Sequence, residues 1–169
     1  MNFKVLAICL IGFVTIFKGT SSGQACNLTG TYTIGTGGNY PNINTAVSDL
    51  ENNGIGGSVI LEITSAYQSA DDTFPVVINA IPCSSPTKTV TIRPASGTTV
   101  TISSLSVMFS FGGANYVKFD GRAGGTGTTS ALNLICYNSP AFYFVNSGSN
   151  NTVRYVNIQS STQSNGVIS

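Results

Sequence analysis

Two stretches in the second half of the chain repeat the same order of apolar runs and polar corners. "FSFGGANYVKFDG" (109–121) holds one short run, a Gly/Asn corner and a second run, and "FYFVNSGSNNTVRYVNIQ" (142–159) has the same order. Residues 115–119 of the first align with residues 151–155 of the second. A third apolar run follows each unit after another polar loop. Three short strands per unit, repeated, predict a coiled solenoid rather than a set of hairpins.

Short apolar or β-branched runs separated by turns make up most of the chain. They lie at 31–35, 58–64, 74–81, 89–95, 99–104, 107–111, 116–121, 132–138 (third run of the first unit), 141–146, 152–159 and 166–169 (third run of the second). Most alternate apolar and polar residues, as strands with one buried face do. We expect these inside: Val90, Ile92, Val100, Ile102, Val117 and Phe119. We expect these outside: Thr89, Thr91, Thr101, Lys118 and Asp120. A sandwich of hairpins is the alternative, but no Asn-Gly or Asp-Gly pair forms a two-residue link between runs.

The stretch "GTGGNYPNINTAVSDLENNG" (35–54) is the clearest helix in the sequence. An apolar stripe recurs at i, i+3, i+4 and i+7, formed by Ile43, Ala46, Val47 and Leu50. Gly54 suits the residue that ends such a helix. A glycine turn before a helix can bind phosphate, but no basic residue lies between Lys18 and Lys88. We therefore expect the helix to cover the apolar end of the first coil.

Residues 1–25 have the pattern of a signal peptide. Lys4 precedes an apolar run at 5–17, and small polar residues lead to Ala25. The run is shorter than the about 20 residues that a membrane span needs. We expect cleavage after Ala25, a secreted or cell-surface protein, and no membrane span in the mature chain.

Three cysteines remain after such a cleavage, namely Cys26, Cys83 and Cys136. An oxidising compartment permits a disulfide, and Cys26–Cys83 is one permitted pairing. Acylation of Cys26 is an alternative. Cys136, within "LNLICYN", is expected to be a small buried apolar residue.

Composition excludes several classes of function. Charged residues make up 8% of the chain, against about 25% in an average protein. The seven basic and six acidic residues become five and six when Lys4 and Lys18 leave with the signal peptide, so no charge pattern indicates nucleic acid. The absence of histidine excludes a Ser-His-Asp or Cys-His unit in this chain. We expect no cofactor and no metal site.

The ordered phrases of the sequence resemble those of a known group of proteins. "GTYTIGTGGNYPNINTAVSDLENNGIGGSVILEITSAY" is followed by "FPVVINAIP", "TVTIRPASG", "VTISS" and "ANYVKFDG". Over 29–160 the chain resembles large exported proteins with right-handed parallel β-helix, pectin-lyase-like domains, which bacteria secrete through the type IX system. "GGNYPNINTAVSDL" is also similar to the start of pectin methylesterases, where a comparable helix plugs the β-helix.

This resemblance implies more about architecture than about activity. Many such proteins are adhesins or surface proteins of unknown role, and some β-helix relatives cleave or de-esterify polysaccharides. The full-length proteins commonly end in a sorting domain, which is absent from this sequence, and "NGVIS" reads as the start of another strand. We expect the sequence to be an N-terminal piece of a longer protein.

The candidate catalytic residues are Lys118, Asp120 and Arg122 in "YVKFDGRAGG". If the strand continued, all three would share its outward face, where a lyase needs a base and a cation that stabilises an enolate. Asp120–Gly121 is alternatively a turn signal. Three other acidic residues are candidates. Glu62 is interpreted as part of the polar face of a strand, and Asp71 and Asp72 as a solvated pair in a loop.

The candidate ligand-binding residues are Tyr143 and Tyr155, whose rings could stack on sugars if they are exposed. Tyr143 is out of phase with Phe142 and Phe144, so it is expected to face out of its strand. The alternative is that these tyrosines only cover the rims of the coils.

The sequence therefore predicts an all-β fold, a right-handed parallel β-helix (solenoid) with an N-terminal amphipathic capping helix. We expect a signal peptide at 1–25, the N-terminal strand and capping helix at 26–57, and incomplete coils at 58–169. The expected function is a structural or adhesive module of a larger secreted or cell-surface bacterial protein, without a catalytic site in this stretch. The alternatives are the N-terminal part of a polysaccharide lyase, esterase or glycoside hydrolase, or a carbohydrate-binding module. Polysaccharides or cell-surface glycans are the expected partners.

Two structural features distinguish these functions. An enzyme should stack acidic or basic residues on one sheet in adjacent coils. A binding module should have a shallow groove lined by aromatic side chains, and a purely structural module should have neither.

Overall fold

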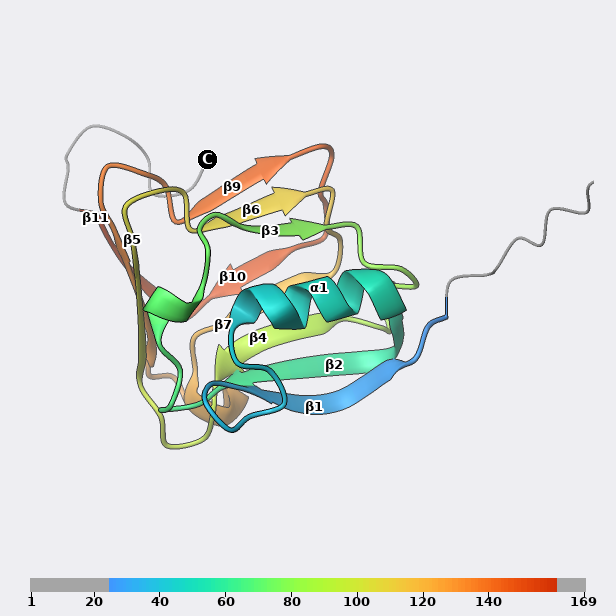
Figure 1. Ribbon diagram of the computed structural model, residues 1–169, viewed down its shortest axis with the longest axis horizontal. Coiled ribbons are helices and arrows are strands. Elements are labelled where there is room, and N and C mark those ends of the chain that lie inside the picture. Colours follow the sequence, from blue (N-terminus) through green and yellow to red (C-terminus); the bar gives the residue numbers. More distant parts are fainter. Residues whose placement is uncertain (1–24, 161–169) are drawn as a thin grey trace, which may run out of the picture.

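The computed structural model describes residues 25–160, whose strands form three parallel sheets (Figure 1). The five-stranded sheet has the order β1-β2-β4-β7-β10, and two three-stranded sheets have the orders β11-β8-β5 and β3-β6-β9. The strands are β1 (Leu28–Ile34), β2 (Ile55–Ile63), β3 (Val76–Asn79), β4 (Val90–Pro94), β5 (Val100–Ser104), β6 (Phe109–Gly112), β7 (Val117–Asp120), β8 (Leu132–Cys136), β9 (Phe142–Val145), β10 (Thr152–Arg154) and β11 (Val156–Ser160). Within the described residues every pairing between these strands is parallel. A sandwich of hairpins is thereby excluded, because hairpins pair antiparallel strands.

The chain visits the three sheets in a fixed rotation. After β4 in the five-stranded sheet come β5 and then β6, each in a different sheet, and the order repeats as β7, β8 and β9. We call one passage through the three sheets a circuit. Strands at the same place in successive circuits are neighbours, with Val100 opposite Leu132 and Phe109 opposite Phe142. Side chains that lie far apart in the sequence are thus brought into rows that cross the strands.

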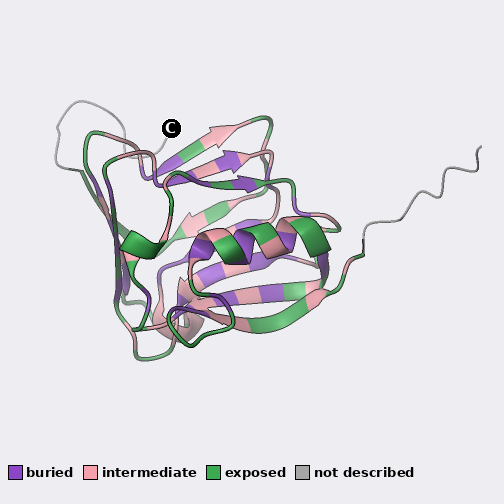
Figure 2. Ribbon diagram, in the orientation of Figure 1, coloured by how far each residue is buried: buried purple, intermediate pink, exposed green. Residues whose placement is uncertain are grey.

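Inward-facing side chains from all three sheets form one hydrophobic core. The six residues expected inside are at most 4% exposed, which confirms that prediction. Figure 2 shows how buried positions alternate with more exposed ones along the strands. Phenylalanine rings stack between circuits, since the ring centres of Phe111 and Phe144 are 4.5 Å apart and those of Phe109 and Phe142 are 5.6 Å apart. Phe119, on β7 of the five-stranded sheet, joins this cluster, and its ring centre is 4.6 Å from that of Phe109.

The predicted helix is α1 (Ile43–Asn53). Asn42 caps its first turn by accepting the Thr45 N–H at 2.8 Å, and Gly54, with a φ of 59°, ends it. The four residues of the apolar stripe are at most 3% exposed, so the predicted buried face is confirmed.

α1 also covers the open edge of the β3-β6-β9 sheet, beside which it lies in Figure 1. Asn44 accepts the Thr73 N–H at 2.7 Å and donates to the Thr73 carbonyl at 3.1 Å. Glu51 accepts the Asn79 N–H at 2.7 Å. These helix side chains bind backbone groups at both ends of β3, where a neighbouring strand would otherwise bind.

The run at 152–159 is two strands rather than the single strand expected. β10 ends at Arg154, Tyr155 has a φ of 53°, and β11 begins at Val156 in a different sheet. One left-handed residue makes this corner, so the sequence contains no polar loop that would mark it. The third strand of the second unit is therefore β11, and the run at 166–169 lies outside the described residues.

A disulfide joins Cys26, before β1, to Cys83, after β3, with the two Cα atoms 6.2 Å apart. The Cys26 sulfur is therefore not available for the alternative of acylation. Cys136 has a free thiol and is fully buried, as predicted, and burial raises its pKa. Except for Ala25, the predicted signal peptide at 1–25 lies outside the described part of the chain, and the expected boundary at 57/58 falls within β2.

Candidate functional site

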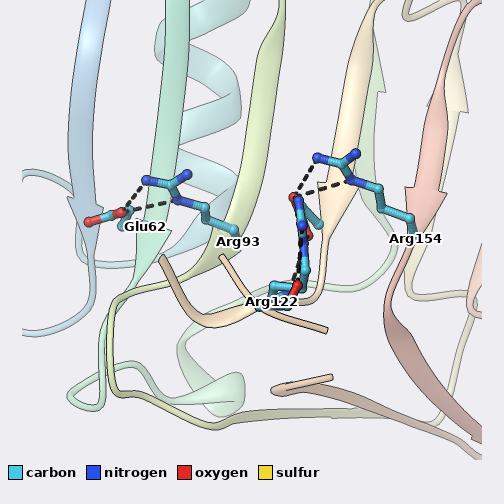
Figure 3. Close-up of polar contacts among 6 residues, drawn as sticks. Glu62, Arg93, Arg122 and Arg154 are labelled. Atoms are coloured by element: carbon cyan, nitrogen blue, oxygen red, sulfur yellow. Dashed lines mark hydrogen bonds and ion pairs between the residues drawn. The ribbon is translucent and has the colours of Figure 1, made fainter. Parts of the chain in front are cut away.

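The outer face of the five-stranded sheet carries a row of four charged side chains, which we call the charged row. Glu62 on β2 lies opposite Arg93 on β4, and Asp120 on β7 lies opposite Arg154 on β10. Arg93 donates from Nε and Nη2 to Glu62 Oε1 at 3.1 and 2.8 Å (Figure 3). Acid and base alternate along this row because strands of successive circuits stack in register.

Asp120 is the most constrained member of the charged row. Arg122 donates from Nε to Asp120 Oδ1 at 2.8 Å and from Nη2 to Asp120 Oδ2 at 2.7 Å. Arg154 donates from Nε and Nη2 to Asp120 Oδ2 at 3.2 and 2.7 Å. The Arg122 N–H also reaches Oδ1 at 3.3 Å, which confirms the turn expected at Asp120–Gly121.

Asp120 points outward from its strand as expected, but it is shielded from solvent, because the residue is only 2% exposed. Its side chain is on the outer face, but Arg122 folds back over it after the strand ends, and Arg154 reaches it from β10. The Arg122 hydrogen bonds, with help from Arg154, hold the pKa of Asp120 well below its ordinary value despite the opposing effect of burial. A general base must accept a proton near the working pH, so Asp120 is unsuited to that role. Thr89 is also buried, at 8% exposure, contrary to expectation.

The other two predicted catalytic residues, Arg122 and Lys118, differ in their contacts. Arg122 joins Asp120, and its guanidinium carbon lies 4.7 Å from the ring centre of Tyr155, a cation–π contact. Lys118 is opposite Thr91 and Thr152, and it forms no salt bridge with any residue in 25–160. The structure thus brings together two of the three candidates and adds a tyrosine.

Tyr143, the second ligand-binding candidate, faces outward from β9 as predicted. It is 43% exposed, whereas Phe142 beside it is fully buried. Its neighbour across the strands is Ser110 on β6.

A shallow hollow of about 440 Å³ lies at the ends of successive circuits, and we call it the serine hollow. Its lining comes from a short 3-10 helix at Ser69–Asp71 and the residues after it, from the end of β5 and the corner that follows, and from the first residue after β8. The lining residues are Ser69, Ala70, Asp72, Phe74, Ser103, Ser104, Leu105, Ser106 and Tyr137. Leu105 is 82% exposed and Tyr137 is 40% exposed, so the hollow presents apolar and aromatic surface beside its serine side chains.

Asp72, at the edge of the serine hollow, is half-buried rather than solvated as expected. Its Oδ2 accepts the Tyr67 hydroxyl at 2.6 Å, and its Oδ1 accepts the Asn44 N–H at 2.8 Å. Burial raises the pKa of Asp72, and these two hydrogen bonds oppose that effect. Asp71 is exposed, in line with the prediction. Residues 25–160 contain no group of three or more His, Cys, Asp or Glu side chains that could hold a metal ion.

A second hollow, of about 670 Å³, runs along the outer face of α1. It is lined by Asn39, Tyr40, Asn44, Thr45, Ser48, Asp49 and Asn52. Tyr40 is only 9% exposed and donates its hydroxyl to Asp49, so this hollow offers amides and hydroxyls without an exposed ring.

Sequence reasoning missed Arg93 and Arg154, and it considered Tyr137 only as one of seven tyrosines that could stack on sugars. Arg93 and Arg154 bind partners 31 and 34 residues away, and the only available signal was their position on the polar side of alternating strands. Tyr137 directly follows the buried Cys136 at the end of β8, so strand alternation would have placed it outward.

No family model, curated protein or solved structure matches the chain. Among the described residues there is also no helix with the length and apolar character to cross a membrane.

Proposed function

We propose that the three parallel sheets form a right-handed parallel β-helix with α1 as its N-terminal cap. The rotation of the chain through three parallel sheets supports this proposal, as does the burial of α1 against their edge. The right-handed sense follows from the strong preference of parallel crossover connections for that hand. An experimentally determined structure tests the proposal, and a left-handed course of the chain would overturn it.

We propose further that this domain is a structural or adhesive module of an exported bacterial protein of the kind that the sequence resembles. Stacked charges on one outer face are also the feature expected of an enzyme, so the observation that carries the proposal is the pairing of these charges with one another in the charged row. Each carboxylate in it is bound by at least one guanidinium, and Asp120 is bound by two. Paired charges on stacked strands hold neighbouring circuits together. A Cys26–Cys83 disulfide is suited to an oxidising, extracellular setting.

An incubation of the mature chain with insoluble polysaccharides tests this function. The amount of protein retained on the solid is measured together with reducing ends, unsaturated uronates and methanol released into solution. We expect retention without any released product. Product release that the Asp120→Asn variant lacks, while it still folds, would overturn the structural or adhesive role.

A polysaccharide lyase, esterase or glycoside hydrolase is the second candidate. The observation that favours it is the same stacking of acidic and basic side chains on one outer face in adjacent circuits. Arg154 is the most accessible member of the row, with 49% of its side chain exposed. If the row is catalytic, Arg154→Ala abolishes product release under conditions in which the variant is still folded.

A further inference from the structure

The serine hollow is a rigid feature because its three segments are hydrogen-bonded to one another. Ser69 Oγ donates to the Thr101 carbonyl at 3.3 Å and accepts the Ser103 N–H at 3.4 Å. The Tyr137 N–H donates to the Ser104 carbonyl at 3.0 Å. Side chains from three successive circuits are thereby held at fixed positions, and a ligand that binds there orders little additional structure.

Two hydroxyl groups of the hollow are available to a ligand, whereas Ser69, Ser104 and Ser106 already bind other groups of the protein. Ser103 is exposed, and its hydroxyl makes no hydrogen bond within residues 25–160. The Tyr137 hydroxyl likewise has no partner in that part of the chain. Each hydroxyl can donate one hydrogen bond and accept others.

The charge of the hollow selects among ligand classes. No Lys or Arg is among the residues that line it, and its one ionisable acid is Asp72. Phosphates, nucleic acids and uronates would therefore meet a carboxylate and no cation. A neutral ligand with hydroxyl groups would instead meet the Ser103 hydroxyl and the aromatic ring of Tyr137. The volume of about 440 Å³ falls within the ordinary range for small-molecule sites, about 300 to 1,000 Å³.

We propose that the serine hollow binds a short stretch of neutral glycan, with a sugar ring stacked on Tyr137 and a sugar hydroxyl bonded to Ser103. Leu105, exposed in the same hollow, adds apolar surface. This inference rests on the adhesive role proposed above, and it assigns that role to one site. It places binding away from the charged row and from the predicted residues Tyr143 and Tyr155.

Titration calorimetry of the mature chain with defined oligosaccharides tests the site. The probes are neutral hexasaccharides of β-1,4-linked glucose, mannose and xylose, with hexagalacturonate as the charged comparison. We expect at least one neutral probe to bind, Tyr137→Ala to weaken that binding about tenfold, and Tyr137→Phe to retain most of it.

Tyr143→Ala tests the competing position, because Tyr143 is 43% exposed and Tyr137 is 40% exposed, but only Tyr137 lines the hollow. A larger loss of binding in Tyr143→Ala than in Tyr137→Ala would overturn the site. Melting temperatures of all variants verify that each one folds. Equal binding by wild type and Tyr137→Ala, binding of hexagalacturonate alone, or no binding of any neutral probe would each overturn the site. Retention on polysaccharide by a Tyr137→Ala variant that still folds would overturn this site while leaving the adhesive role intact.

Discussion

At the scale of single residues, Asp120 shows how a carboxylate on an outer sheet face becomes part of the fold. Its two oxygens accept hydrogen bonds from two guanidinium groups and one backbone N–H. Charge-assisted bonds of this kind are stronger than neutral ones. The carboxylate therefore stabilises the folded chain only while it is ionised.

Replacement of Asp120 by Asn should lower the free energy of unfolding by about 2 kcal/mol at pH 7, since it weakens hydrogen bonds between charged groups. The folded pKa of Asp120 is lowered, so its stabilisation is fully present above the unfolded pKa of about 3.9 and is lost as pH falls toward the folded value. The difference between wild type and variant should thus shrink below about pH 4. Urea unfolding at a series of pH values measures it. Asp71→Asn, on the exposed neighbour of Asp72, serves as the control, and a gap independent of pH would contradict the assignment.

Gly121 lies directly against the backbone of the next circuit. A Cβ atom there would overlap the carbonyl oxygen of Tyr155, at the corner between β10 and β11. Gly121→Ala should therefore lower the free energy of unfolding by about 3 kcal/mol through forced backbone movement. Gly97→Ala, where a Cβ meets open space and the only penalty is a φ of +70°, should lower it by about 1 kcal/mol. Hydrogen exchange should show the additional loss of protection in β11, and equal effects of the two variants would argue against the close contact.

At the scale of elements, α1 replaces a strand at the edge of the sheet. Its buried stripe packs on the core while Asn44 and Glu51 bind the backbone of the β3 segment. The helix therefore has two roles, because it covers apolar side chains and it satisfies edge hydrogen-bonding groups.

Leu50, 1% exposed on α1, provides the test of the first role. Leu50→Ala should lower the free energy of unfolding by about 3 kcal/mol because it leaves a cavity in the core. Ser48→Ala, on the exposed face of the same helix, should change it by less than about 0.5 kcal/mol. Chemical denaturation of both variants makes the comparison, and a small effect at Leu50 would show that α1 does not seal the core.

At the scale of the whole molecule, the disulfide closes a large loop around the N-terminal part of the fold. Cys26 and Cys83 are 57 residues apart in sequence, and between them lie β1, α1, β2 and β3. A cross-link over such a span restricts the unfolded chain strongly.

The double variant Cys26→Ser, Cys83→Ser should lose about 4 kcal/mol of stability on the chain-entropy account of a loop of this length. Reduction of the wild-type protein should cause a loss of the same size, whereas the reductant should not affect the double variant. Mass spectrometry of the protein digested without reduction should find the Cys26–Cys83 peptide pair. A lipid on Cys26 would contradict the disulfide.

The sequence by itself determined the local features of this protein. Alternation placed Val90, Ile92 and Phe119 in the core, and the helical stripe that contains Leu50 was read correctly, because such patterns depend only on the period of a strand or helix. The corner at Tyr155 escaped notice since a single residue makes it. The predicted all-β fold with parallel neighbours followed from the repeated units and the lack of hairpin links.

Only the tertiary structure decided which distant side chains meet. Glu62 and Arg93 are 31 residues apart, Asp120 and Arg154 are 34 apart, and Asn133 and Asn157 are 24 apart, although each pair joins neighbouring strands. Circuits differ in length because their corner loops differ, so the register between strands cannot be counted along the chain. The same stacking buried Asp120 under two arginines and assembled the serine hollow from three circuits. The sequence therefore determines which chemical groups are present, and the stacking of the circuits decides which of them lie together in a site.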